Sequence, residues 1–445
     1  MVKKILAFLL AICAVSAIGG CSSSPASSSS SSSGASAASG TTKLSGSLNI
    51  WAWGADEEAQ ARKDAIELFI KNHPELKVTY TVIPTANQVW DQKASAALAA
   101  GTAGDVIQMS PDYYGMNTKY YADLNPYVKK DGVDLKKAIT PGLLDGYYDA
   151  DGKLEGLPLH TNCFEIAYNK DRFDKAGVAY PKDGWKFEEL LDWGKKFATG
   201  SGSNQTYAIA KHWVMDNLML YAGGGTPYSS DLKTSNMGSS EIVKSLELYQ
   251  KLISSGIMPS DTAQKTIPAE TLFVSGKAAM YMMGGFESHQ VITDAEENGI
   301  NLGFTSMPSD PNGNELNVQY ATGWAITESS KNKDAAWQFI KESSFGNEEM
   351  NKINAKVGIP ANNTIAEKDY AQMKTGDVQF DNSYYVQHIS KAHLNPFGGT
   401  LASSGNIWTT MVQEVTLNGK NPEEIVKTYS PKITAEFANY PFNKK

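Results

Sequence analysis

The sequence predicts an α/β fold, and three features of its pattern point to this class. Apolar residues alternate with polar ones over short stretches, as they do in strands. In the stretches between, apolar residues recur at helical spacing, and the two patterns follow one another along the chain. This order predicts mostly parallel sheets, with ligand sites at the carboxyl ends of the strands. The 445 residues are enough for two or more domains.

The first elements are predicted between residues 48 and 82. Residues 48–53 alternate, which predicts a strand with Leu48, Ile50 and Ala52 on one face. Residues 59–70 have helical spacing, and His73 and Pro74 end that helix. Residues 78–82 alternate again. A strand, a helix and a strand within so short a stretch predict a right-handed βαβ unit.

The same rhythm continues through the rest of the chain. Gly101 ends a helix predicted over 87–100, and a short buried strand follows at 105–109. Further strands are predicted at 164–168, 278–283 and 323–327, and further helices at 187–197 and 242–253.

The N-terminus predicts export and a lipid anchor. Lys3 and Lys4 precede an apolar run at 5–18 that is short for a membrane span. The residues Ile18, Gly19, Gly20 and Cys21 follow, and they resemble a bacterial lipobox. The resemblance implies a signal peptide over 1–20 and a lipid on Cys21; an ordinary secretory leader with a chance cysteine is the alternative. Residues 21–42 are rich in serine and predict a flexible tether.

Composition and motifs exclude several function classes. The formal net charge of -8 argues against nucleic acid as a partner. Cys13 and Cys21 belong to the leader region, so Cys163 is left without a partner for an internal disulfide. The sequence has no closely spaced cysteine pair and no HExxH motif, so no structural or catalytic zinc site is expected. We expect no metal site and no cofactor.

Six segments, in this order and spacing, carry a family resemblance. They cover residues 48–80, 96–110, 152–178, 272–287, 323–342 and 357–361, and their most specific pieces are YNKD at 168–171 and GKAAM at 276–280. Together they resemble the extracellular solute-binding proteins of bacterial carbohydrate ABC importers, the family that includes maltose-binding protein. The resemblance extends over nearly the whole chain after the tether.

The resemblance implies a two-lobe fold of the type II periplasmic-binding-protein kind. Each lobe would be a mostly parallel sheet flanked by helices, with the ligand in the cleft between the lobes. We expect lobe one to hold 43–160 plus 308–356, and lobe two to hold 161–307 plus 361–445. The three passages between the lobes are expected near 159–164, 304–308 and 356–360.

The chemistry of a sugar predicts what the cleft needs. Aromatic rings bury the C–H faces of a sugar, and carboxylate, amide or imidazole groups bond its hydroxyls. Residues of these kinds follow predicted strands or lie at the first passage between lobes. The candidates are Trp53, Asp56, Asp112, Tyr113, Asn162, His212, Trp213, Phe286, Glu287, Trp324 and Trp408. By resemblance, Asn162 stands where an acidic residue is common and Phe286 where tryptophan is common, so the particular sugar stays open.

These observations predict a lipid-anchored protein on the outer face of the cell membrane. It would capture a sugar or oligosaccharide by closing its lobes and deliver it to the permease subunits of an ABC importer, as a monomer and without enzymatic activity. Two alternatives remain. One is a similar binding protein for a polyamine, glycerol phosphate or iron, and the other is a surface glycosidase that uses paired carboxylates.

Overall fold

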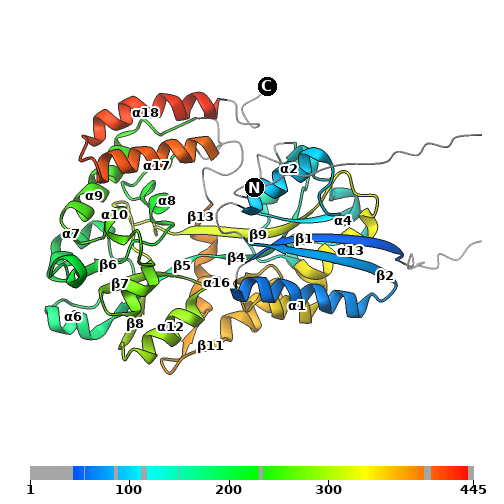
Figure 1. Cartoon of the computed structure of the whole chain (residues 1–445), viewed down its shortest axis with the longest axis horizontal. Coiled ribbons are helices and arrows are strands. Elements are labelled where there is room, and N and C mark those ends of the chain that lie inside the picture. The colour runs from blue at the N-terminus through cyan, green and yellow to red at the C-terminus, as the bar shows by residue number, and fades with distance from the viewer. Residues whose placement is uncertain are drawn as a thin grey trace, which may run out of the picture. The chain divides into compact units, whose positions relative to one another are not determined.

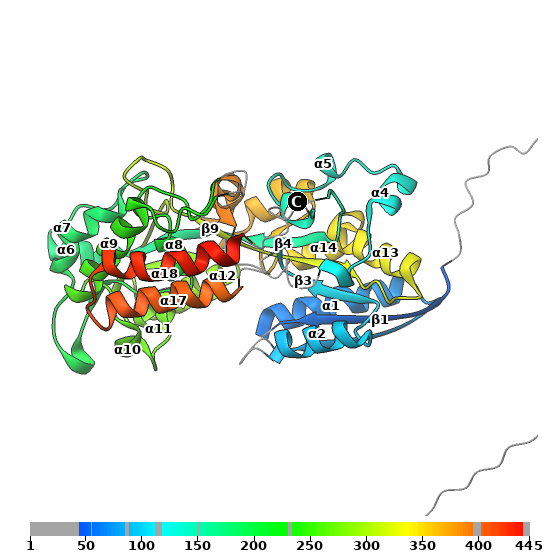
Figure 2. The same ribbon diagram turned by 90° about the horizontal axis from the view of Figure 1, so that it is seen from above.

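Two β-sheets organise the folded part of the chain, which we describe from a computed structural model (Figure 1). The structure describes residues 44–54, 56–84, 89–111, 118–149, 151–229, 234–394 and 402–438. The described residues from 44 onward form one unit. Within this unit, Figures 1 and 2 both show β9 running from the helices around one sheet toward those around the other.

The larger sheet has the strand order β10-β4-β9-β3-β1-β2, and β13 pairs with β9. Its strands are β1 (Gly46–Trp53), β2 (Leu76–Ile83), β3 (Val106–Met109), β4 (Leu157–Asn162), β9 (Val318–Ile326), β10 (Ile359–Pro360) and β13 (His393–Leu394). The strands β2 and β3 both pair with β1 in parallel. The predicted βαβ unit is therefore confirmed, with α1 (Asp56–Asn72) as its helix.

The smaller sheet has the order β6-β7-β5-β8. Its strands are β5 (Phe164–Asn169), β6 (Tyr207–Ile209), β7 (Ala278–Gly284) and β8 (Leu302–Thr305). A hairpin of β11 (Lys374–Thr375) and β12 (Phe380–Asp381) stands apart from both sheets. Only Cys163 separates β4 from β5, so the chain passes directly from one sheet into the other.

The α/β class is confirmed, but the expectation of mostly parallel sheets is wrong. In the smaller sheet, β5 runs antiparallel to both β7 and β8, and only β6 and β7 are parallel. In the larger sheet, β9 runs antiparallel to β3 and β4. Because β5 and β9 arrive from the other sheet rather than from a neighbouring crossover helix, nothing requires them to be parallel.

Helices surround both sheets. The α-helices after α1 are α2 (Val89–Ala100), α4 (Asn125–Asp131), α5 (Leu135–Ala138), α6 (Lys170–Ala176), α7 (Leu190–Trp193), α8 (Met215–Met219), α9 (Ser240–Ser254), α10 (Asp261–Gln264), α11 (Ala269–Val274), α12 (Ser288–Glu297), α13 (Lys333–Lys341), α14 (Glu348–Asn354), α15 (Asn363–Lys368), α16 (Ser383–His388), α17 (Ala402–Thr416) and α18 (Pro422–Phe437). None of the helices in the described ranges is long and apolar enough to span a membrane.

Short turns of other helical types complete the fold. They are η3 (Thr118–Tyr120), η4 (Asp145–Tyr147), η5 (Phe187–Glu189), η6 (Gly194–Lys196), η7 (Gly202–Asn204), η9 (Tyr370–Gln372), η10 (Ile389–Lys391) and one π-helical turn, η8 (Glu342–Gly346). The helix predicted over 187–197 is broken into η5, α7 and η6. It breaks at Gly194, where a Cβ atom would come within 2.9 Å of Ile257, so close packing outweighs helical spacing.

Two buried apolar clusters form the core. The first contains the interior of the larger sheet and continues onto one side of the smaller sheet, where it includes Cys163 and Tyr281. The second covers the other side of the smaller sheet, under α9, α17 and α18. Because Cys163 and its neighbours are shared by both sheets, the passage between the sheets is itself buried.

Candidate functional site

Four aromatic side chains meet at one edge of the smaller sheet. The parallel strands β6 and β7 end at this edge, and Trp213 and Phe286 follow them in the chain. Phe164 begins β5 opposite the end of β7, and Tyr320 comes from β9. We call Phe164, Trp213, Phe286 and Tyr320 the aromatic platform.

The rings of the platform contact one another edge to face. The ring centroid of the buried Phe164 lies 6.2 Å from that of Phe286 and 6.4 Å from that of Tyr320. The Trp213 centroid lies 4.9 Å from that of Tyr320. Trp213 is 63% exposed and Phe286 is 36% exposed, so both present ring surface to solvent. Aromatic area held this way is available for a ligand with an apolar face.

His212 and Glu287 hold the two loops that carry the exposed rings. His212 Nε2 lies 3.3 Å from Glu287 Oε1, and the His212 ring also contacts Phe164. The Glu287 carboxylate accepts hydrogen bonds from the backbone N–H of Gly284 and the hydroxyl of Tyr281. Burial, together with the Glu287 charge, raises the pKa of Tyr281 well above its ordinary value, so the phenol stays a donor. His212 is buried, so its predicted place beside the site is better described as support than as ligand contact.

A pocket of about 480 Å³ opens beside Trp213. Its walls come from Trp213 itself, from the His212–Glu287 pair and from the segment 261–270. Lys211 also lines the pocket; it is 8% exposed and forms ion pairs with Asp216, at 3.1 Å, and with Asp261. The pocket is of the size that holds small molecules.

A second polar cluster lies on the larger sheet, where α1 begins. Arg62 is buried, and its guanidinium donates to Glu58 Oε1 at 3.1 Å and to His160 Nε2. Burial and the Arg62 charge hold the pKa of His160 well below its ordinary value, so the imidazole is neutral and its Nε2 accepts a hydrogen bond from the Arg62 guanidinium. Burial raises the pKa of Glu58, against the opposing charge of Arg62.

Asn162 ends β4, next to the passage between the sheets, and is 5% exposed. Its amide nitrogen donates to the carbonyl of Val357, and its Oδ1 accepts no hydrogen bond. A Cβ atom on Gly285 would lie 2.9 Å from that oxygen, and one on Gly358 would lie 2.8 Å from the amide nitrogen. The backbone at Gly285 and Gly358 therefore approaches the Asn162 side chain too closely for a larger residue at either position.

Three of the predicted tryptophans lie in the core, and we withdraw them from the candidate site. Trp53 is 8% exposed and packs against Trp90. Trp324 is 1% exposed and donates its indole N–H to Ser343, and Trp408 is 1% exposed and donates to the carbonyl of Asp216. A ring whose two faces are both covered by protein has no free face on which a sugar can stack.

Other predicted residues lie outside what the structure describes. Asp112, Tyr113 and Cys21 fall in undescribed stretches, and the side chain of Asp56 is likewise outside the description, although its backbone begins α1. Within the described ranges, no cluster of three or more His, Cys, Asp or Glu side chains could hold a metal ion.

Sequence reasoning missed Tyr320 and Asn217. Asn217, in α8, donates its amide N–H to the Tyr320 hydroxyl at 2.8 Å. The strand containing Tyr320 was predicted to begin only at residue 323, whereas β9 begins at Val318. If the strand had been predicted to extend back to residue 318, Tyr320 would have been placed on it, opposite Asn162.

Comparison with known proteins identifies what the chain is similar to. Residues 54–342 match the family model described as bacterial extracellular solute-binding protein. A putative binding protein of Brucella abortus is 24% identical over 381 residues, which cover 82% of this chain and 87% of that protein. A lactose-binding protein of Rhizobium radiobacter is 22% identical, covering 68% and 71%. The solved structure of a Listeria monocytogenes ABC substrate-binding protein in complex with cycloalternan has a TM-score of 0.75 at 21% identity, covering 88% and 98%.

Proposed function

The chain belongs to the family of bacterial extracellular solute-binding proteins, and we propose that its solute is a sugar or oligosaccharide. In this proposal the larger and smaller sheets are the cores of two lobes, and the solute lies between them against the aromatic platform. The protein then delivers the solute to the permease subunits of an ABC importer. It acts as a monomer and as a binding protein rather than as an enzyme.

The observation that carries the proposal is the exposed aromatic surface beside a polar pocket. Trp213 and Phe286 offer apolar faces that match the C–H faces of a pyranose. Around them lie groups that bond hydroxyls, namely the Asn217–Tyr320 pair and the pocket lined by Asp261 and Gln264. The relatives with sugar in their names support the same class of ligand.

A thermal-shift panel tests the solute class. The panel contains glucose, lactose, maltose and maltotetraose, with spermidine and sn-glycerol 3-phosphate as the non-sugar arms. A ligand at one hundred times its dissociation constant stabilises the native state by about 2.7 kcal/mol, so binding is readily seen. Stabilisation by spermidine or glycerol phosphate alone would overturn the carbohydrate proposal. Mass spectrometry of the recovered sugar then distinguishes binding from glycosidase action, because a binding protein leaves its length unchanged.

We expect the solute to close the lobes. The single residue Cys163 joins a strand of the larger sheet to a strand of the smaller sheet. Short connections of this kind between two packed units favour hinge closure around a ligand. A sugar identified by the panel should therefore reduce the radius of gyration in small-angle scattering. A sugar that fails the panel serves as control, and an unchanged radius at saturation would indicate a preformed pocket instead.

We also propose that Cys21 carries a lipid that holds the protein to the outer face of the membrane. The proposal rests on the lipobox-like residues before Cys21 and the serine-rich tether after it. Two or more acyl chains on one residue give stable anchoring. Cys21→Ala is expected to move the protein from the membrane fraction to the medium or to block its processing. Cys163→Ala is the matched control, and membrane retention of a normally processed Cys21→Ala protein would contradict the proposal.

A further inference from the structure

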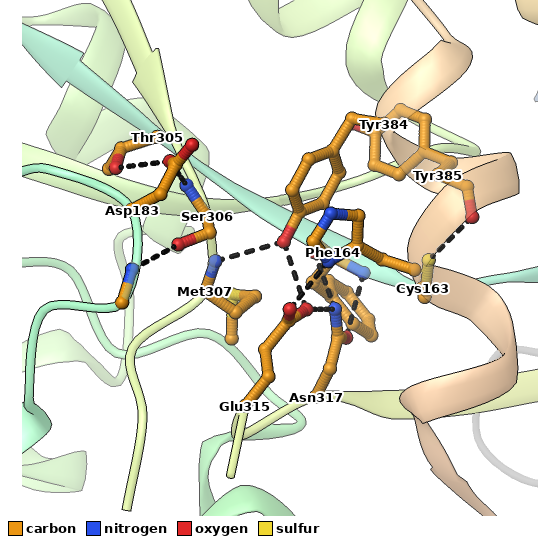
Figure 3. Close-up of polar contacts among 12 residues, drawn as sticks. Cys163, Phe164, Asp183, Thr305, Ser306, Met307, Glu315, Asn317, Tyr384 and Tyr385 are labelled. Atoms are coloured by element: carbon orange, nitrogen blue, oxygen red, sulfur yellow. Dashed lines mark hydrogen bonds and ion pairs between the residues drawn. The ribbon is translucent and has the colours of Figure 1, made fainter. Parts of the chain in front are cut away.

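Asn317 lies where the segments that join the two sheets come together. It is fully buried, and it is the residue immediately before β9. Its side-chain amide forms two hydrogen bonds with the backbone of Phe164, the first residue of β5, as the backbone of a neighbouring strand would. The amide nitrogen donates to the carbonyl of Phe164 at 2.8 Å, and Oδ1 accepts from the N–H of Phe164 at 3.0 Å. Figure 3 shows this double contact.

Asn317 also connects to the C-terminal segment. Its backbone carbonyl accepts the N–H of His393, where β13 joins β9. Its amide nitrogen donates to Glu315 Oε1 at 3.1 Å. The same carboxylate accepts from the Tyr384 hydroxyl at 3.0 Å and from His388 Nδ1, both on α16.

The Glu315 carboxylate is charged in this setting. Although burial opposes it, hydrogen bonds from His388 and Asn317 hold the pKa of Glu315 below its ordinary value. The Tyr384 hydroxyl in turn accepts the N–H of Met307, which follows β8, as Figure 3 shows. Glu315, Asn317, Tyr384 and His388, which we call the hinge cluster, therefore join the start of β5, the segment between β8 and β9, and α16.

The hinge cluster borders both open space and the aromatic platform. On one side, a cavity of about 740 Å³ is lined by Glu315, His388 and His393. On the other side, Phe164, which Asn317 holds by its backbone, is the platform ring that contacts both Phe286 and Tyr320. A movement of the segments at Asn317 would therefore be transmitted to the platform, and the cavity gives α16 room to move.

We propose that Asn317 is a positioning residue that fixes the pivot between the two sheets and, through Phe164, the orientation of the aromatic platform. This inference rests on the proposed function for its link to solute affinity. The pivot itself is testable without any solute.

The main test measures the distance between the two sheets in the solute-free full chain. Spin labels are placed on cysteines substituted for Lys71, in α1, and Glu247, in α9, which are both exposed. The native Cys163 is buried and stays unlabelled, and Cys13 and Cys21 are replaced by serine in every variant so that they take no label. We expect Asn317→Ala to give a broader or shifted distance distribution than wild type. Asn312→Ala is the matched control, because Asn312 lies in the same connecting segment but bonds only the exposed carbonyl of Gly224 through its side chain.

Amide exchange provides the local readout. In Asn317→Ala, the amide protons of Phe164 and Val318 lose their acceptor and should exchange about 10 to 100 times faster, relative to that of Ala167 within β5. If Asn317→Ala does not fold, Tyr384→Phe is used instead, because it removes one hydroxyl between Met307 and Glu315. Tyr384→Phe should change the distance distribution in the same way as Asn317→Ala, but to a smaller extent.

The outcomes separate this inference from the proposed function. Faster exchange with an unchanged distance distribution would mean that Asn317 is merely structural, and would overturn the inference. A changed distribution in a protein that binds no sugar of the panel would support the pivot and contradict the carbohydrate proposal. Once the panel has identified a sugar, we expect Asn317→Ala to lower the affinity of the protein for that sugar and Asn312→Ala to leave this affinity unchanged.

Discussion

Replacing Trp213 with alanine is expected to weaken sugar binding by about 2 to 4 kcal/mol, the range found for aromatic anchors in binding sites. Trp213 is 63% exposed and stands next to the pocket, so its ring gains contact area only when a solute covers it. The free energy of unfolding without sugar should change little, because exposed side chains contribute little to stability. Isothermal titration, beside denaturant unfolding of the solute-free protein, measures both quantities.

Tyr180→Ala is the matched control for this prediction. Tyr180 is also an exposed aromatic residue, at 40%, but its ring contacts Tyr168 and Phe173 rather than the platform. Its replacement should leave the affinity unchanged. If Trp213→Ala binds sugar as tightly as wild type, the platform is not the binding surface and the solute class has to be reconsidered.

Phe286→Ala should give a smaller loss of affinity than Trp213→Ala. Phe286 is 36% exposed and also contacts Phe164 edge to face. Part of the cost of its removal therefore appears in the stability of the solute-free protein. A large loss of stability with unaltered affinity would show that Phe286 acts only as packing.

The sequence predicted local structure well, because strands and helices follow from the spacing of apolar residues along the chain. The alternation in 48–53 and 78–82 corresponds to β1 and β2, and the helix between them ends before His73 as expected. The relative direction of neighbouring strands was harder to predict from the sequence. Whether β5 and β9 run parallel or antiparallel to their neighbours depends on segments that return from the other sheet, which short-range spacing does not encode.

The candidate site was predictable only in part. Trp213 and Phe286 follow β6 and β7, whose carboxyl ends share one edge of the sheet, so both residues lie at that edge. Trp324 and Trp408 satisfied equally plausible rules and are nevertheless buried. A tryptophan looks the same in sequence whether its ring faces a cleft or a core, because its exposure is decided by contacts between distant segments.

Trp408→Ala gives the largest expected effect on stability. Trp408 is 1% exposed, lies in the second core cluster and belongs to α17, which packs on α9 and α18. Removing so large a buried side chain leaves a cavity and should lower the free energy of unfolding by about 3 to 5 kcal/mol. The carbonyl of Asp216 also loses the indole N–H that it accepts at 2.8 Å. Denaturant unfolding of the solute-free protein measures the loss.

Trp408→Phe distinguishes the two parts of that loss and tests the assignment of Trp408 to the core. Phenylalanine keeps much of the ring but cannot donate to Asp216, so its cost should be smaller than that of alanine. Asp216, which accepts the Trp408 indole N–H, and Asn217, which bonds the platform residue Tyr320, both lie in α8. Unfolding of a destabilised variant would therefore also lower its apparent affinity. For this reason affinity is measured well below the unfolding midpoint, where each variant is fully folded. If Trp408→Ala instead kept wild-type stability and lost sugar affinity, Trp408 would be exposed to the solute in solution. Its ring would then have to leave the packing between α9 and α17 that buries it here, and the core beneath the smaller sheet would have to be rebuilt around that movement.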